Sequence, residues 1–203
     1  RNESTLVVTG DASRTAPTTY YPGFVPGPSG SRITAMRAQM AGASTTSMLR
    51  LFMVDCQPGP IPTRITFSTT TATVITPTAH GLTTGDKITL RNAFPYQFNV
   101  TDVAVTVVTT TEFTYAMASA PTVNAVAVGN YVTTPATSVM RLVDEVPVVA
   151  VTPSSTIEAP SIDIAAASPG LFPFVLAANK MLRLTVDGTQ TTGIAVTTTG
   201  ADL

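Results

Sequence analysis

Alternation of hydrophobic and polar side chains is the clearest pattern along this chain. Near the C-terminus, Leu182, Leu184 and Val186 alternate with polar side chains, as in a strand with one buried face. Residues 47–55 differ, because their apolar side chains fall on both parities, which indicates a strand covered on both faces by packing or by subunit contact. A similar string recurs at residues 139–144, and we expect the two segments to pair.

Composition extends this pattern to an all-β fold. Threonine, which is β-branched and stiff, occurs in runs at residues 69–71, 109–111 and 197–199. The chain also holds 16 prolines and 13 glycines, which leave little room for long helices. We therefore expect an outer antiparallel, jelly-roll-like β-sandwich, interrupted by a small inserted β-barrel or sandwich. Further strands are expected at residues 32–40, 64–68, 71–76, 87–91, 102–108, 112–115, 125–132, 172–176, 181–187 and 193–198.

Turn-forming residues set the connections between these strands. Gly81 and Gly85 permit the positive φ that a compact reversal needs. Pro147 interrupts a β-rich segment and indicates an edge strand or a bulge. A turn at Asp187-Gly188 is expected to join the last two strands.

Two proline-containing segments flank a central block whose sequence pattern differs from that of the rest of the chain. Pro58, Pro60 and Pro62 precede the block, and residues 133–137 follow it. Loop tips accept insertions at low cost, so this framing predicts a module inserted at the tip of a hairpin. We place the inserted domain at residues 61–136 and the outer domain at residues 1–60 plus 137–203.

The N-terminal stretch, about residues 1–31, is predicted to be an extended arm. Its proline-rich part, residues 20–30, reads as an extended surface segment and not as a core strand. It either crosses the surface of its own domain or lays its aromatic side chains on an adjacent subunit. The candidate subunit-interface residues are Tyr20, Tyr21, Phe24, Arg50, Phe52 and Arg141. The numbering begins at Arg1 rather than at methionine, so whether a leader segment was removed or left out of the numbering stays an open question.

The inserted block carries an ordered series of motifs: His80-Gly81-Leu82, Gly85-Asp86, Ile88-Thr89-Leu90, Val105-Thr106-Val107-Val108 and Phe113-Thr114-Tyr115. In this series the block resembles a repeated β-module of tailed-phage virion and tail proteins. The match covers roughly a third of the chain. One departure is the segment at residues 93–98, which is more aromatic than the module's pattern.

The outer domain carries the motifs Arg50-Leu51-Phe52, Glu145-Val146-Pro147-Val148 and Ala150-Val151-Thr152-Pro153-Ser154. In these motifs it is similar to a second group of small phage β proteins. In that group the first two motifs are near neighbours in sequence, which agrees with an insertion between them here. The resemblance implies a component of the virion.

Residues able to carry catalysis are few and scattered. His80 is the only histidine and lies among turn-forming residues, so we expect a structural role for it. Asp144 and Glu145 are the only adjacent acids, and neighbours in a strand face opposite sides, so they are not placed to flank one glycosidic bond. Cys56 is the only cysteine, which excludes an internal disulfide; a buried thiol and a reactive one are the two readings. We expect no enzymatic activity, metal or cofactor.

The charge and hydropathy of the chain indicate which classes of binding partner to expect. Charged residues make up 11 % of the chain, the formal net charge is −1 and the basic residues are spread out, so we expect no nucleic-acid contact. No apolar run approaches the roughly 18 residues of a membrane span, so we expect a soluble protein without membrane contact. Isolated arginines suit hydrogen bonds to neighbouring chains.

Three functions from different classes fit these features. The first is a capsid decoration or cement protein on the exterior of the virion, a homotrimer that contacts the major capsid protein, with host-surface glycan contact through the inserted module. The second is a tail, baseplate or fibre component, although neither heptads nor glycine-rich repeats are present to build a shaft. The third, a carbohydrate-binding or depolymerising β protein, is disfavoured by the lack of tryptophan and the sparse acids.

Overall fold

The chain divides into two compact units of β structure. The computed structural model describes residues 2–154, 159–168 and 171–203; Arg1 of the predicted arm lies outside the described residues. Strands account for 54 % of the chain and helices for 4 %, which confirms the all-β class. The outer unit comprises Arg1–Asp55 and Val139–Leu203, and the inserted unit comprises Cys56–Ser138. These limits lie within five residues of the boundaries at 61 and 136 expected from the proline clusters.

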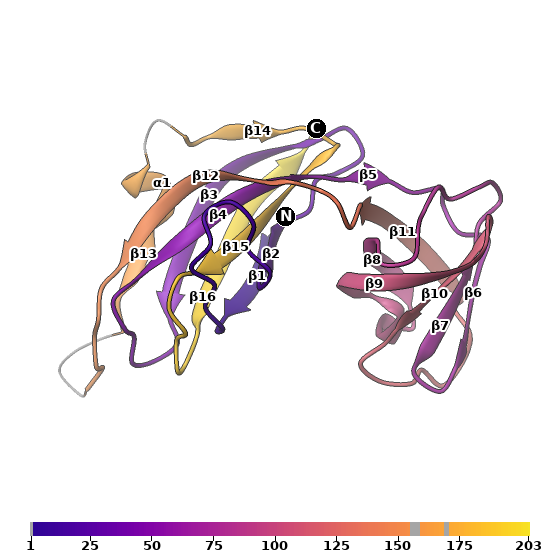
Figure 1. The fold of residues 1–203 in the computed structure, drawn as a ribbon, viewed down its shortest axis with the longest axis horizontal. Coiled ribbons are helices and arrows are strands. Elements are labelled where there is room, and N and C mark those ends of the chain that lie inside the picture. Colours follow the sequence, from indigo (N-terminus) through magenta and orange to yellow (C-terminus); the bar gives the residue numbers. More distant parts are fainter. Residues whose placement is uncertain (1, 155–158, 169–170) are drawn as a thin grey trace. The chain divides into compact units, whose positions relative to one another are not determined.

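Two antiparallel sheets form the outer unit (Figure 1). The first sheet runs β1-β16-β3-β13, with β14 also paired to β3, and the second runs β12-β4-β15-β2. The strands are β1 (Asn2–Val7), β2 (Tyr21–Phe24), β3 (Ser31–Met40), β4 (Ser47–Asp55), β12 (Met140–Val148), β13 (Ser161–Asp163), β14 (Phe174–Leu176), β15 (Lys180–Val186) and β16 (Ile194–Asp202). One helical turn, α1 (Ile164–Ala167), follows β13.

The strand order of the outer unit is that of a jelly roll. Without the short β14, the eight strands taken in chain order give one sheet ordered 1-8-3-6 and a second ordered 5-4-7-2. Successive strands then alternate between the two sheets, except for the fourth and fifth, β4 and β12, which are neighbours in the same sheet. This order shows the jelly-roll-like sandwich that the alternating segments predicted.

The β4–β12 pair is the hairpin whose tip carries the inserted unit. The two strands are antiparallel, with Val54 opposite Met140 and Leu142 opposite Phe52, which confirms the pairing expected from their similar strings. Because the ladder brings Asp55 and Val139 to the same end, the chain can leave and return there with little loop-closure cost. Pro147 lies in β12 at the sheet edge, as expected, where its missing N–H leaves no gap in a central ladder.

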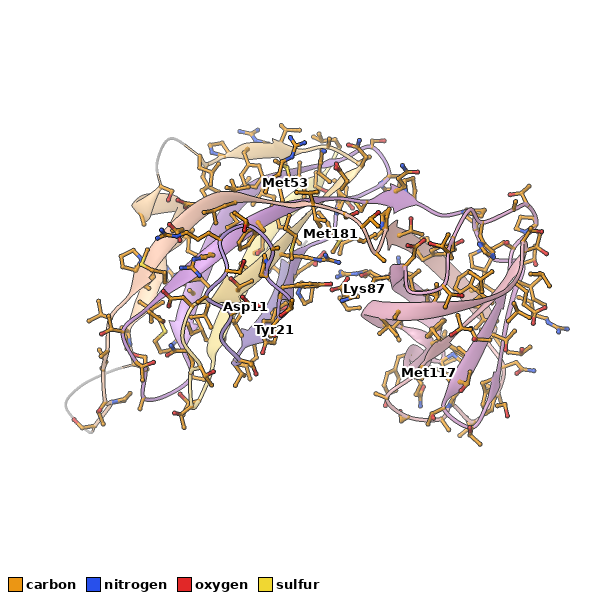
Figure 2. All side chains as sticks on the ribbon, viewed as in Figure 1. Asp11, Tyr21, Met53, Lys87, Met117 and Met181 are labelled. Carbon is orange, nitrogen blue, oxygen red and sulfur yellow. The ribbon has the colours of Figure 1, made fainter. Side chains whose placement is uncertain are left out.

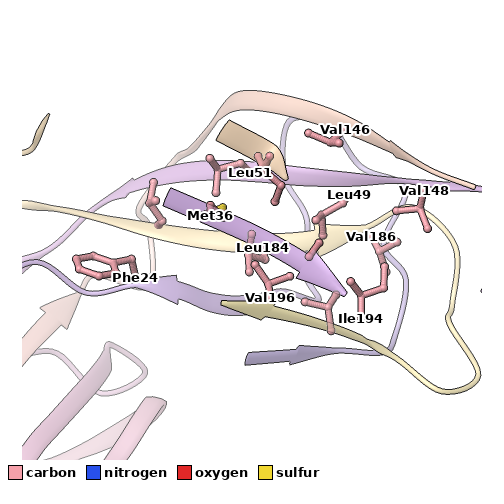
Figure 3. Packing of buried hydrophobic residues seen from close by; sticks show 14 of the residues in the cluster. Phe24, Met36, Leu49, Leu51, Val146, Val148, Leu184, Val186, Ile194 and Val196 are labelled. Carbon is pink, nitrogen blue, oxygen red and sulfur yellow. The ribbon is translucent and has the colours of Figure 1, made fainter. Parts of the chain in front are cut away.

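The apolar core of the outer unit lies between the two sheets. Its side chains alternate along each strand, so that Leu49 and Leu51 of β4 meet residues from the facing sheet such as Ile194 and Val196 (Figure 3). Phe24 of β2 belongs to this cluster and has no exposed surface.

The expectation that residues 20–30 hold no core strand is therefore wrong. Tyr21–Phe24 forms β2, which pairs with β15 and places Phe24 opposite Leu182. Pro22 is tolerated because β2 is an edge strand. The proline content obscured a short strand whose partner lies about 160 residues away in sequence.

Strand β15 also differs from what its sequence pattern predicts. Leu182 and Leu184 face the core as expected, but Arg183 and Thr185 on the opposite face are also buried, at 3 % and 0 % exposure. The turn at Asp187-Gly188 does not close a hairpin, because β15 and β16 belong to different sheets. Local alternation predicts which side chains share a face, but what covers each face is a tertiary property.

The inserted unit is one curled seven-stranded sheet around its own core. Its strands are β5 (Gln57–Pro58), β6 (Arg64–Ser68), β7 (Thr71–Ile75), β8 (Lys87–Phe94), β9 (Val100–Thr109), β10 (Glu112–Ala116) and β11 (Ala127–Thr134), ordered β5-β11-β8-β9-β10-β7-β6, with a short 3-10 turn at Tyr96–Phe98. Ala125 N–H donates to the Ile65 carbonyl at 3.1 Å beside the edge strand β6. Phe98, Phe113 and Tyr131 fill the interior.

Excision of the insert should leave a folded sandwich. We expect a chain in which Asp55 is joined to Val139 by a two-residue Asn-Gly turn to unfold cooperatively, because Val54 and Met140 are already ladder partners. Circular dichroism and urea unfolding of this chain measure the outcome. The same chain with a rigid Pro-Pro join is the control for hairpin closure, and aggregation of every excised form contradicts the division into units.

Truncation of Phe24 tests whether β2 is part of the core. Phe24→Ala should lower the free energy of unfolding by about 3–5 kcal/mol, because a fully buried ring is removed from a packed interior. Val175→Ala, on an exposed side chain of the same unit, is the control and should change it by less than about 0.5 kcal/mol. Urea denaturation gives both values, and equal effects would show that β2 does not support the core.

Candidate functional site

The six residues expected at a subunit interface divide into interior and surface positions. Phe24 and Phe52 have no exposed surface and Arg50 is 4 % exposed. Because a side chain buried within its own chain cannot meet a neighbour, the assignment of these three to an interface is corrected to the interior. Tyr20 and Tyr21 are half-buried, and Arg141 is exposed.

The outer face of the second sheet is covered by the chain itself. Residues 9–20, here called the strap, connect β1 to β2 and lie against β4 and β15. Asp11 N–H donates to the Val186 carbonyl at 2.7 Å, and the Tyr20 ring lies 4.0 Å from the guanidinium carbon of Arg183. Of the two coverings expected for residues 47–55, intramolecular packing is the one observed.

Paired charges hold the strap to this face. Glu145 Oε1 accepts from Arg50 Nε at 2.6 Å and from Arg14 Nε at 2.9 Å, so one carboxylate joins β12, β4 and the strap. Arg50 also donates to the Asp11 carbonyl and lies 3.5 Å from Asp187 Oδ2. The hydrogen bonds from Arg50 and Arg14 lower the pKa of Glu145. A buried arginine is tolerated here because its donors have acceptors on several sides.

Within the strap, Asp11 organises a tight loop (Figure 2). Its carboxylate accepts from the backbone N–H groups of Thr19, Ser13 and Thr18 at 2.7–3.0 Å. These donors stabilise the charged form and lower the pKa of Asp11 to about 2. The aspartate therefore acts as a fixed acceptor that shapes the strap.

His80 has structural partners in the inserted unit. Its Nε2 lies 2.9 Å from the Thr109 carbonyl, and its Nδ1 accepts from Leu82 N–H at 3.0 Å. The ring packs edge-on against Phe113, with centroids 5.3 Å apart. Gly81 and Gly85 have φ of 69° and 99°, which confirms the expected positive-φ turns.

The acidic side chains Asp144, Glu145 and Asp86 each bind their own partners within the chain. Asp144 accepts from the Ser168 hydroxyl, whereas its neighbour Glu145 binds the two arginines, so the adjacent acids do not act on one point. Asp86 accepts from the N–H groups of Thr83 and Ala136. Burial raises the pKa of Asp86, but these donors outweigh it and lower the pKa.

No metal-binding cluster is found in the part of the chain that the structure describes. Among residues 2–154, 159–168 and 171–203, no three His, Cys, Asp or Glu side chains gather closely enough to hold an ion. Cys56 is buried, which fits the structural reading of its thiol. None of the described helices is both long and apolar enough to cross a bilayer.

A group of exposed hydrophobic residues on the inserted unit was not identified as a site from the sequence. Phe94 and Tyr96 are 61 % and 72 % exposed, and Val126, bonded through its N–H to the Phe94 carbonyl, is 75 % exposed. The signal available in the sequence was the unusual aromatic content of residues 93–98. Exposed aromatic side chains in a group often mark a contact surface.

No protein-family model, curated protein or solved structure matches this chain.

Protonation of the Asp11 carboxylate at low pH should reduce the stability that the strap contributes to the fold. Because its pKa is about 2 in the folded chain and about 3.9 in an unfolded one, Asp11 contributes stability above about pH 4 that is lost as the pH falls toward 2. We expect Asp11→Asn to lower Tm at pH 7, with the gap to the parent chain shrinking as the pH approaches 2. Thermal unfolding across this range checks it; a gap that is constant with pH contradicts the assigned role.

Proposed function

We propose that the protein is a non-catalytic structural component of a tailed phage particle that decorates the outside of the head as a homotrimer bound to the major capsid protein. The observation that carries the proposal is the jelly roll interrupted at its one same-sheet hairpin. Jelly rolls are common in viral capsid proteins, although they also occur in lectins and cupins, so this support is an analogy of fold.

The positions of the phage-like motifs add support. Arg50-Leu51-Phe52 lies on β4 and Glu145-Val146-Pro147-Val148 on β12, and Glu145 is opposite Arg50 in the ladder. Motifs that would be neighbours without the insert are thus neighbours in space with it. This agrees with a phage sandwich into which a second phage module has been placed.

The use of the polar side chains favours a structural role over a catalytic one. His80, Asp86 and Glu145 each bind backbone or arginine partners that maintain a turn, a connection or the strap. A catalytic acid or base needs to meet a substrate proton, and these groups are already committed to internal partners.

Exposed side chains of the outer unit offer material for contacts with other subunits. Val139, Val149 and Val175 are each more than 60 % exposed, and Arg141 is an exposed residue of the edge strand β12. Single contacts of this kind are weak, but many copies on one lattice add avidity. Arg141 is the member of the expected interface set that is best placed for such a contact.

Copy number in purified particles tests the proposal. We expect the protein to approach the abundance of the major capsid protein and to cross-link to it, whereas a baseplate or fibre part would be present at tens of copies or fewer, as an order of magnitude for closed rings. Quantitative mass spectrometry of separated heads and tails measures this. Recovery on tails alone supports the tail alternative and rejects decoration of the head.

The substitution Arg141→Glu tests whether β12 contacts the head. It should reduce binding of the purified protein to undecorated heads, while Arg37→Glu, on an exposed position of β3, serves as a charge-matched control. Equal loss with both variants would assign the effect to net charge rather than to β12.

A further inference from the structure

The end of the β8–β11 ribbon combines an exposed ring with exposed amides. The ladder places Phe94 opposite Ala127 and Arg91 opposite Asn130. Ala93 is buried in the core, whereas Asn92 and Phe94 on either side of it are exposed. The exposed amide and the exposed ring are thus two positions apart on the same strand, with the buried Ala93 between them.

The two amides are held together before any ligand arrives. Asn92 Nδ2 donates to Asn130 Oδ1 at 3.1 Å, and both residues are exposed. The backbone is shaped for this pair: Asn92 has φ of 62°, and Gly129 beside it has φ of 63°, where an added Cβ would lie 2.1 Å from the Arg91 carbonyl. A positive φ at a non-glycine residue is uncommon and is retained where the surroundings enforce it.

This arrangement presents one donor and one acceptor side by side. An amide pair joined by a single hydrogen bond leaves the Asn92 carbonyl oxygen as an acceptor and the Asn130 amide nitrogen as a donor. Two adjacent hydroxyl groups on a sugar ring can donate to the first and accept from the second. Because the pair is already ordered, less side-chain entropy is lost on binding.

The two segments that carry the exposed residues contain no charged side chain: residues 92–99 and 118–130 hold no Asp, Glu, Lys or Arg. Arg91, opposite Asn130 in the ladder, is half-buried and already has an interaction partner. An anionic ligand such as a phosphate or an acidic sugar would find no opposite charge in these segments. A neutral ligand with an apolar face and paired hydroxyls fits them.

We propose that Asn92, Asn130 and Phe94 form a binding site for a neutral pyranose unit of a glycan, with the exposed Tyr96, two residues further along the chain, as a second aromatic surface. The apolar C–H face of the sugar stacks on the Phe94 ring, and adjacent hydroxyls bind the amide pair. Sugar binding by the inserted unit goes beyond the proposed structural role and does not depend on it.

Binding to soluble oligosaccharides tests the site. The probes are the hexamers of β-1,4-glucose, α-1,4-glucose, α-1,6-mannose and β-1,4-N-acetylglucosamine, with polygalacturonate as the charged comparison, all added to the full chain and followed by calorimetry and ligand-observed NMR. We expect millimolar or tighter binding of at least one neutral hexamer. Phe94→Ala should weaken it about tenfold or more, which is the loss of one good contact.

Asn92→Gly removes the amide while glycine accepts the positive φ, so it should also weaken binding without unfolding the chain. Val108→Ala, on a 55 % exposed residue elsewhere in the inserted unit, is the control and should bind as the parent does. Thermal unfolding of each variant confirms that it is folded.

Three results overturn the inference: no binding of any neutral hexamer, preference for polygalacturonate, or equal binding by parent, Phe94→Ala and Asn92→Gly. A change in oligomeric state with Phe94→Ala, in place of a change in sugar binding, would instead identify the surface as a contact between copies of the chain. The abundance of the protein on heads is measured separately, so failure here leaves the proposed structural role to its own test.

Discussion

The antiparallel ladder between β4 and β12 is the interaction on which the rest of the structure depends. Among the described strands of the outer unit, only here are successive strands of the jelly roll neighbours in one sheet, and the ladder brings Asp55 and Val139 to the same end. An insertion of 83 residues between strands in different sheets would have to span the sandwich, whereas here it begins and ends at adjacent positions. The separate core of the inserted unit, built on residues such as Phe98 and Phe113, then makes that unit a compact body in its own right.

Burial of the second sheet on both faces sets the chemistry of the outer unit. One face packs against the first sheet through aliphatic side chains, and the other carries Arg50 and Arg183 beneath the strap. Charges placed there require partners, which explains why Glu145, Asp187 and the strap carbonyl of Asp11 surround Arg50. The polar side chains that could have served a reaction are thereby used to close the fold.

The inserted unit divides its residues differently. Its turn residues His80 and Asp86 bind backbone partners, whereas the exposed Phe94 lies on β8, two positions from Asn92 of the hydrogen-bonded amide pair. The residues that hold the turns are therefore distinct from those of the proposed sugar site. Substitutions at Phe94 or Asn92 can alter a contact surface without removing a buried side chain, because both are exposed.

Sequence alone determined the class of fold, most strands and the location of the insertion, because strand alternation, β-branched residues and prolines act locally. It predicted β6 at residues 64–68 with the observed limits, and the β4–β12 pairing from two similar strings. It missed β2 and treated Phe24 as a surface aromatic, since nothing near Tyr21–Phe24 reveals that its partner is β15. Only the tertiary structure decided what covers each face, and with it which arginine is buried, which aromatic is exposed and which amides meet, because these depend on contacts between segments far apart in the chain.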